Sequence, residues 1–177
     1  MTDAIDEGPI LFQREVAVSP RATSKSLASR MDEAACGFAA DILACEIEGS
    51  LPAGRVSNEP GSRYPPVRPE NGLIDWTCSA TDIDRRVRAC TGTIEAYALV
   101  RGIRLVVEQT EPVTSCGWSA QPASQLVAKE KHARGNALVV AAGRGFVRVL
   151  RWHLSNGVNA PEELEAWLPL AVGERLS

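Results

Sequence analysis

The sequence predicts an α/β segment at the N-terminus, followed after a connector by a small β-barrel or sandwich. Three observations favour this fold class. A strand pattern precedes a long amphipathic helix pattern within the first 50 residues, residues 51–72 contain five prolines and three glycines, and about five short strand candidates follow. The 177 residues, 45% hydrophobic and 23% charged, are of ordinary globular composition and suffice for one domain or two small ones.

The first 50 residues contain a predicted strand and a predicted helix. Residues 10–18 end in β-branched side chains, which is typical of a strand. Thr23 or Ser24 is a good N-cap for a long helix that Gly49 ends. Apolar residues recur along this helix every three or four positions and form one stripe: Leu27, Met31, Ala34 or Ala35, Phe38, Ile42 and Cys45. We expect the stripe to be buried, most simply against a sheet.

The residues beyond the connector contain a second helix pattern and a series of strand patterns. Ser79 or Thr81 is expected to cap a helix over residues 82–90, whose acidic residues come first and whose arginines come later, as the helix dipole favours. Strands are predicted over residues 95–101, 103–110, 125–128, 136–142 and 146–154. The first two flank Arg101-Gly102, which is a hairpin signal. Pro161 is expected to open a final short helix.

Charge is distributed unevenly along the chain, whose net charge is −3. Residues 1–66 contain 6 basic and 10 acidic residues, whereas residues 84–151 contain 11 basic and 5 acidic residues. The basic second half suggests an anionic partner, and a solvated face with counter-charges is the alternative. Five cysteines without a C-x-x-C pair, and only two histidines, give no metal-ligand spacing, so we expect free thiols and no metal.

Targeting and catalytic motifs are scarce. No apolar run approaches the roughly 18 residues of a membrane span, and the acidic N-terminus does not resemble a secretory signal, so we expect a cytoplasmic protein without a membrane partner.

Glycine-rich phosphate loops and nucleophile turns are absent. Asp3 and Asp6 precede a Gly-Pro turn and the predicted strand, where a carboxylate can act as a base. An exposed acidic tail is the alternative.

Four segments, in order along the chain, resemble one family. Residues 5–13 are similar to the "ID-x-G-x-I-x-x-Q" segment of the 10-formyltetrahydrofolate-dependent formyltransferases, the methionyl-tRNA formyltransferase-like family. Residues 68–76 closely resemble the "R-x-P-E-D-G-x-I-D-W" segment that opens their C-terminal part. Residues 87–89 and 173–176 are similar to an "I/V-R-A" helix segment and to a closing "G-x-x-L". The resemblance covers only the C-terminal part of such a protein.

The resemblance implies a domain organisation. Residues 1–50 are expected to be an α/β remnant, the end of a Rossmann-like formyltransferase domain. Residues 51–72 are expected to form a Pro- and Gly-rich linker, and residues 73–177 a small OB-like β-barrel domain. Family members have a catalytic Asn and His in an upstream stretch that this chain lacks, together with the folate loops. We therefore expect the chain to be incomplete and inactive alone, because the oxyanion donors of the reaction are missing.

The resemblance also implies site residues and partners. Asp6 matches the catalytic aspartate, 10-formyltetrahydrofolate would be the formyl donor, and initiator tRNA or another amine substrate would be the partner of a monomer. Phosphate contacts would come from basic residues of the second half: Arg85, Arg101, Arg104, Lys129, Lys131, Arg144 and Arg148. Sugar-amine and siderophore-type N-formyltransferases remain alternatives, as does a non-enzymatic remnant that binds an anionic partner.

Overall fold

The structure, a computed structural model, describes residues 8–56, 61–113, 117–132, 135–155 and 171–176. The chain divides into two compact units, Met1–Pro66 and Val67–Ser177. No helix in these described ranges is long and apolar enough to cross a membrane.

The first unit is built on a single long helix, α1 (Ser24–Ile47), which confirms the predicted helix. Thr23 caps it, because the Ser26 N–H donates to Thr23 Oγ1 over 3.1 Å while the Thr23 N–H donates to Ser26 Oγ over 3.0 Å. This reciprocal pair satisfies two N–H groups at the helix start. Gly49 follows the helix with a φ of 65°, a left-handed conformation that suits glycine.

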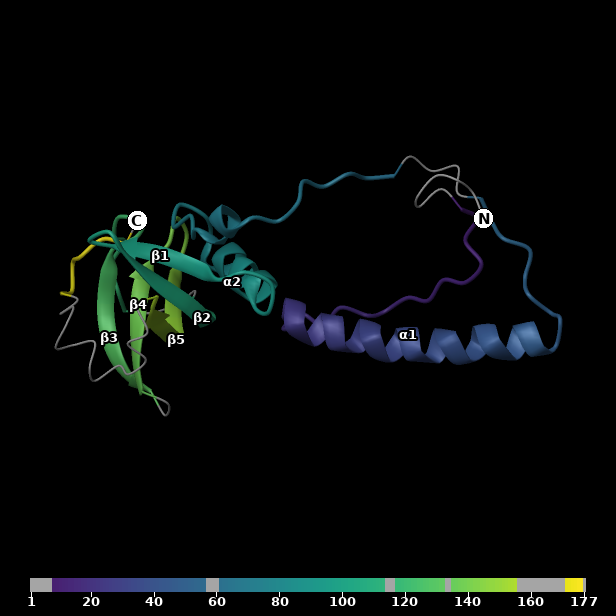
Figure 1. Cartoon of the computed structure of the whole chain (residues 1–177). Helices are drawn as coiled ribbons and strands as arrows, with labels where there is room; N and C mark the ends of the chain where they lie inside the picture. The colour runs from purple at the N-terminus through teal and green to yellow at the C-terminus, as the bar shows by residue number, and fades with distance from the viewer. Residues whose placement is uncertain (1–7, 57–60, 114–116, 133–134, 156–170, 177) are drawn as a thin grey trace. The chain divides into compact units, whose positions relative to one another are not determined.

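The extended segment of residues 10–18 runs back along α1 (Figure 1). Only Ile10 is paired there, through two 2.9 Å backbone hydrogen bonds with Arg55, so the predicted strand is wrong. The segment is held to α1 by side chains instead: Arg14 pairs with Asp41 at 2.9 Å, and its guanidinium lies 5.0 Å from the centre of the Phe38 ring. Strand-forming residues need a neighbouring strand, and no such strand lies beside residues 11–18 in the described chain.

The apolar stripe of α1 is not covered as the sequence analysis expects. None of the described α1 residues is buried. Met31 is 55% exposed and Ile42 is 41% exposed, although both lie on the stripe. The described part of the first unit therefore contains a helix whose apolar face has no sheet of that unit to pack on.

The second unit contains one five-stranded antiparallel sheet with strand order β1-β2-β5-β4-β3 (Figure 1). Its strands match the five predicted ones: β1 (Ala96–Val100), β2 (Ile103–Val113), β3 (Leu126–His132), β4 (Gly135–Ala141) and β5 (Phe146–Leu154). The turn between β1 and β2 is formed by Arg101 and Gly102 with φ angles of 51° and 81°, as the tight-hairpin signal predicts.

Each edge strand of the sheet pairs, at one residue, with a short segment from outside the sheet. At β1, the Ile74 N–H donates to the Tyr97 carbonyl over 2.8 Å. At β3, the Leu126 N–H donates to the Glu174 carbonyl, and the Leu126 carbonyl accepts a hydrogen bond from the Gly173 N–H, each over 2.7 Å. In the described ranges β1 and β3 do not pair with each other, so the sheet is open and a closed barrel is not confirmed.

Helix α2 (Ala80–Cys90) confirms the predicted second helix and packs on this sheet through one apolar face. Ile83, Val87 and Cys90, at spacings of four and three residues, are buried in the core. Asp84 is also buried, where its carboxylate accepts 2.9 Å hydrogen bonds from the Thr110 hydroxyl of β2 and the Arg88 guanidinium. A short 3₁₀ helix, η1 (Pro69–Gly72), precedes the segment that covers β1. The helix predicted after Pro161 lies outside the described residues.

Candidate functional site

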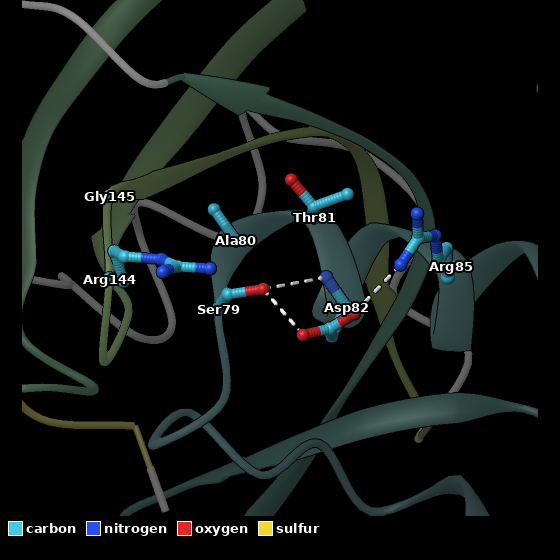
Figure 2. Close-up of a pocket in the computed structure, with 7 residues that line it drawn as sticks. All are labelled: Ser79, Ala80, Thr81, Asp82, Arg85, Arg144 and Gly145. Atoms are coloured by element: carbon cyan, nitrogen blue, oxygen red, sulfur yellow. Dashed lines mark hydrogen bonds and ion pairs between the residues drawn. The ribbon is translucent and has the colours of Figure 1, made fainter.

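An open pocket of about 650 Å³ lies at the start of α2 (Figure 2). Its lining comes from two parts of the second unit, the first residues of α2 and the turn between β4 and β5. The lining residues are Ser79, Ala80, Thr81, Asp82, Arg85, Arg144 and Gly145. The pocket therefore combines the N-terminus of an 11-residue helix with two arginines and one carboxylate.

The helix side of the pocket is fixed by the N-cap. The Asp82 N–H donates to Ser79 Oγ over 3.2 Å, and the Ser79 hydroxyl donates to Asp82 Oδ2 over 2.6 Å. Arg85 Nη1 lies 3.0 Å from the other carboxylate oxygen of Asp82. The hydrogen bond from Ser79 lowers the pKa of Asp82, and the Arg85 contact adds to this effect. Asp82 is therefore charged at neutral pH and offsets one of the two guanidinium charges.

The β4–β5 turn is held against the helix start by backbone hydrogen bonds. The Ala80 N–H donates to the Arg144 carbonyl over 3.0 Å, and the Gly143 N–H donates to the Trp76 carbonyl over 2.8 Å. A Cβ at Gly143 would lie 1.8 Å from the Thr77 carbonyl oxygen, so only glycine permits this approach. The position of Arg144 opposite α2 is thus set by main-chain contacts.

The adjoining turn of residues 75–78 is closed by the Asp75 side chain, which accepts hydrogen bonds from the Thr77 N–H over 2.9 Å and the Thr77 hydroxyl over 2.6 Å. These bonds lower the pKa of Asp75. The Cys78 thiol lies 3.6 Å from the same carboxylate, and desolvation followed by the Asp75 charge raises the pKa of that thiol. Cys78 is accordingly a protonated thiol at neutral pH rather than a reactive thiolate.

The charge balance of the pocket favours an anion. The side chain of Arg144 reaches toward Ser79 in Figure 2, and the charge of Arg144 adds a smaller contribution to the lowered pKa of Asp82. The Thr81 N–H, at the second position of α2, has no acceptor within the same ranges. A helix N-terminus carries a partial positive charge, so it adds to the one guanidinium charge of the pocket that Asp82 does not offset.

The structure brings together only two of the seven predicted nucleic-acid-binding residues, Arg85 and Arg144. Within the described residues, acidic partners are seen for at least four of them: Arg85 with Asp82, Arg101 with Glu174 at 2.7 Å, Arg104 with Glu95 at 4.0 Å, and Arg148 with Glu130 at 2.7 Å and Glu111 at 3.1 Å. Lys129 and Lys131 are exposed on β3. Much of the predicted basic surface is therefore a solvated face with counter-charges, which is the alternative to an anion-binding surface.

Arg148 is the most firmly held of the predicted basic residues. It lies on β5, and its guanidinium reaches carboxylates on β2 and β3. The hydrogen bond to Glu130 is the main cause that raises the pKa of Arg148, and the bond to Glu111 adds to it. A guanidinium already bound to two carboxylates has little capacity left for a phosphate.

Catalytic and cofactor predictions have different outcomes. Asp6 lies outside the described residues. A folate needs a slot for its flat pteridine ring, whereas the pocket lining contains no aromatic or large aliphatic side chain, so the donor does not fit there. No group of three or more His, Cys, Asp or Glu side chains in the searched, described ranges could hold a metal ion.

The pocket also contains Ser79, Thr81 and Asp82, which the sequence indicates only as residues that cap a helix or favour its dipole. Their role as pocket lining depends on the β4–β5 turn, which is more than 60 residues away in the sequence. The only local signal is the Ser-x-x-Asp cap directly after the segment of residues 68–76.

Comparisons with known proteins agree on one family. Residues 66–163 match the family described as "Formyl transferase, C-terminal domain". The chain is 27% identical over 176 residues to a methionyl-tRNA formyltransferase of Dechloromonas aromatica, covering 99% of this chain and 54% of that protein. It is 30% identical over 155 residues to one of Streptomyces coelicolor, covering 88% of this chain and 47% of that protein. The chain thus spans about half the length of these curated relatives.

Solved structures give the same fold at lower sequence identity. A variant of HypX from Aquifex aeolicus is similar with a TM-score of 0.63 at 15% identity, over 85% of this chain and 26% of that one. HypX in complex with tetrahydrofolic acid gives a TM-score of 0.59 at 14% identity, over 99% of this chain and 32% of that one. At this identity the likeness concerns the fold alone.

Proposed function

Because the chain belongs to the formyltransferase family through its C-terminal domain, we propose that it is the acceptor-binding half of an enzyme that formylates methionyl-tRNA. The acceptor is suggested by curated relatives that are named methionyl-tRNA formyltransferase and that match 88–99% of this chain. The donor is a folate-type formyl carrier, 10-formyltetrahydrofolate, consistent with the HypX neighbour in complex with tetrahydrofolic acid.

In this proposal the pocket at the start of α2 binds phosphate groups of the tRNA backbone. Arg144 is the main contact, since no described carboxylate pairs with it, and the Thr81 N–H and the helix dipole assist it. Arg85 contributes less because Asp82 compensates its charge. A contact of this kind orients the acceptor end of the substrate but reads no base sequence.

The reacting centre is proposed to lie elsewhere. Residues 1–50 would be the end of a Rossmann-like catalytic domain, residues 51–72 its linker, and residues 73–177 an OB-like domain. By the resemblance, Asp6 is the catalytic aspartate that tunes a histidine and helps to move protons. The chain itself would supply neither the oxyanion donors nor the donor pocket. Loss of one such oxyanion donor lowers a rate by about 10²–10³, so the 177 residues alone should show no formyl transfer.

Filter binding of methionyl-tRNA across a salt series tests the acceptor part of the proposal. We expect binding that weakens steeply with salt, and Arg144→Ala should reduce the slope of log K against log salt by about 0.7–0.9, the value of one phosphate contact. Arg151→Ala is the matched control, because it removes the same charge on β5 where Arg151 pairs with Glu108 at 2.7 Å. Equal slopes for both variants would refute the role of the pocket. Salt-independent binding would refute phosphate contacts altogether and favour the sugar-amine and siderophore-type acceptors.

A further inference from the structure

Residues 171–176 form a strap that is attached to the start of β3 on one side and to the β1–β2 turn on the other. On the β3 side, the Leu176 N–H donates to the Ser124 carbonyl over 2.8 Å, beside the two backbone hydrogen bonds to β3 described above. On the other side, the Glu174 carboxylate binds Arg101 through Nε at 2.7 Å and through Nη2 at 3.1 Å. The strap therefore joins two parts of the sheet that do not pair with each other in the described ranges.

The ion pair between the strap and the β1–β2 turn shows how strongly the sheet curls. β1 and β3 are opposite edges of the sheet, and in a flat sheet four strand spacings of about 4.8 Å would separate them by about 19 Å. A direct contact between Arg101, in the turn after β1, and Glu174, which pairs with β3, requires the two edges to approach each other. The strap also places the Leu176 side chain, which is fully buried, in the core.

The Glu174 carboxylate is held in place by the strap itself. Its side chain is only 12% exposed, whereas that of Arg101 is 52% exposed. The Ala171 N–H donates to this carboxylate over 3.1 Å, and the Glu174 N–H donates to the Ala171 carbonyl over 3.0 Å. A bidentate contact between a guanidinium and a carboxylate is among the stronger ion pairs in proteins. The strap thus presents a pre-oriented acceptor to Arg101.

Backbone strain lies at the two residues to which the strap is attached. In the described ranges, the non-glycine residues with a positive φ are Arg101, with a φ of 51°, and Ser124, with a φ of 73°. Left-handed backbone is unfavourable for residues that carry a Cβ, and it persists where surrounding contacts enforce it. Arg101 also occupies a tight-turn position that Asn, Asp or Gly usually takes. The strap binds the side chain of Arg101 and the carbonyl of Ser124, so its contacts offset strain at both places.

We propose that the strap is a reversible closure of the sheet, which binds Arg101 and Ser124 together when attached and detaches as one local unit. Its Ser124 side continues toward the pocket. The Ser124 N–H donates to the Ala141 carbonyl, and the Gln125 carbonyl accepts the Ala141 N–H, each over 2.8 Å. Ala141 is the last residue of β4, directly before the turn that carries Arg144. Detachment therefore loosens the end of β4 and the pocket turn beyond it.

Native-state hydrogen exchange of the full chain, followed residue by residue, tests whether the strap opens as one unit. The amides of Leu176 and Ala141 should exchange through a common opening, faster than the amides of the inner strands β2 and β5. Glu174→Gln should accelerate both amides about tenfold, because it removes a charged bidentate contact, and should leave β2 and β5 unchanged. Glu95→Gln is the matched control, because it removes the same charge beside β1, where Glu95 lies 4.0 Å from Arg104, and it should change neither amide.

A change at Ser124 tests the strain, with an effect of the opposite sign. Ser124→Gly permits the left-handed conformation without steric cost, so it should favour the attached strap and slow exchange at Leu176 about threefold. Ser119→Gly is the control, because Ser119 is an exposed residue without a positive φ in the same loop, and it should leave this exchange unchanged. The proposal is overturned if Ser124→Gly fails to slow exchange at Leu176, if Glu174→Gln leaves Ala141 unchanged, or if the strap amides exchange as slowly as those of β2 and β5.

Discussion

Removal of the Thr110 hydroxyl should measurably destabilise the second unit. Thr110 is on β2, and its Oγ1 donates over 2.9 Å to Asp84, whose side chain is only 3% exposed on α2. Thr110→Val keeps the shape of the side chain and removes the donor. A hydrogen bond to a buried charged group is worth about 1.5–3 kcal/mol, so we expect a loss of that size. The Asp84 carboxylate still accepts the Arg88 hydrogen bond, so Thr110→Val does not leave the buried carboxylate without a partner.

Urea unfolding followed by tryptophan fluorescence measures this loss, because all four tryptophans lie in the second unit. The midpoint should fall while the slope m stays constant. Thr93→Val is the control, since the Thr93 hydroxyl is exposed and bonds only to carbonyls of α2. The effect of Thr110→Val should also shrink in an Asp84→Asn background. A loss below about 0.5 kcal/mol, or full additivity with Asp84→Asn, would show that the buried hydrogen bond does not join α2 to the sheet.

Three further outcomes follow from the geometry of the second unit. Gly143→Ala should cost about 1–3 kcal/mol in the same urea assay, because its Cβ would overlap the Thr77 carbonyl; wild-type stability would contradict the observed close approach. Leu176→Ala should cost about 2–5 kcal/mol, because Leu176 is fully buried in the core; a neutral effect would mean that the C-terminal segment does not pack there. The pKa of Asp82 is lowered in the folded state, so its contribution is present above the ordinary Asp pKa and is lost as pH falls through and below about 4. Ser79→Ala should flatten that acid dependence in pH-resolved unfolding, and an unchanged profile would exclude the Ser79 contact as its cause.

Much of the second unit could be predicted because its signals are local. Ser79 and the spacing of Ile83, Val87 and Cys90 determine α2, and Arg101-Gly102 determines the first hairpin. Short apolar runs between turn signals were sufficient to place all five strands within a few residues of their bounds. These signals depend on neighbours in the sequence and hold regardless of the rest of the chain.

The failures concern structure that depends on distant partners. Residues 10–18 have strand composition, but a strand exists only where another strand completes its hydrogen bonds. The pocket joins α2 to a turn around Arg144 that approaches through Gly143, and nothing near Ser79 indicates that approach. The basic surface was predicted from a charge count, which does not reveal that Arg148 already contacts Glu111 and Glu130.

The short segments that pair with the two edge strands, β1 and β3, constrain the order in which the second unit can fold. The segment that pairs with β1 lies near the start of the second unit, at Ile74, and the segment that pairs with β3 lies near the end of that unit, at Gly173 and Glu174. During synthesis the β3 edge is complete in sequence well before its cover emerges from the ribosome, which leaves exposed N–H and C=O groups open to other chains. Chains that lack residues 173–176 should therefore expose the β3 edge at Leu126, lose the Leu176 side chain from the core, and aggregate through β3.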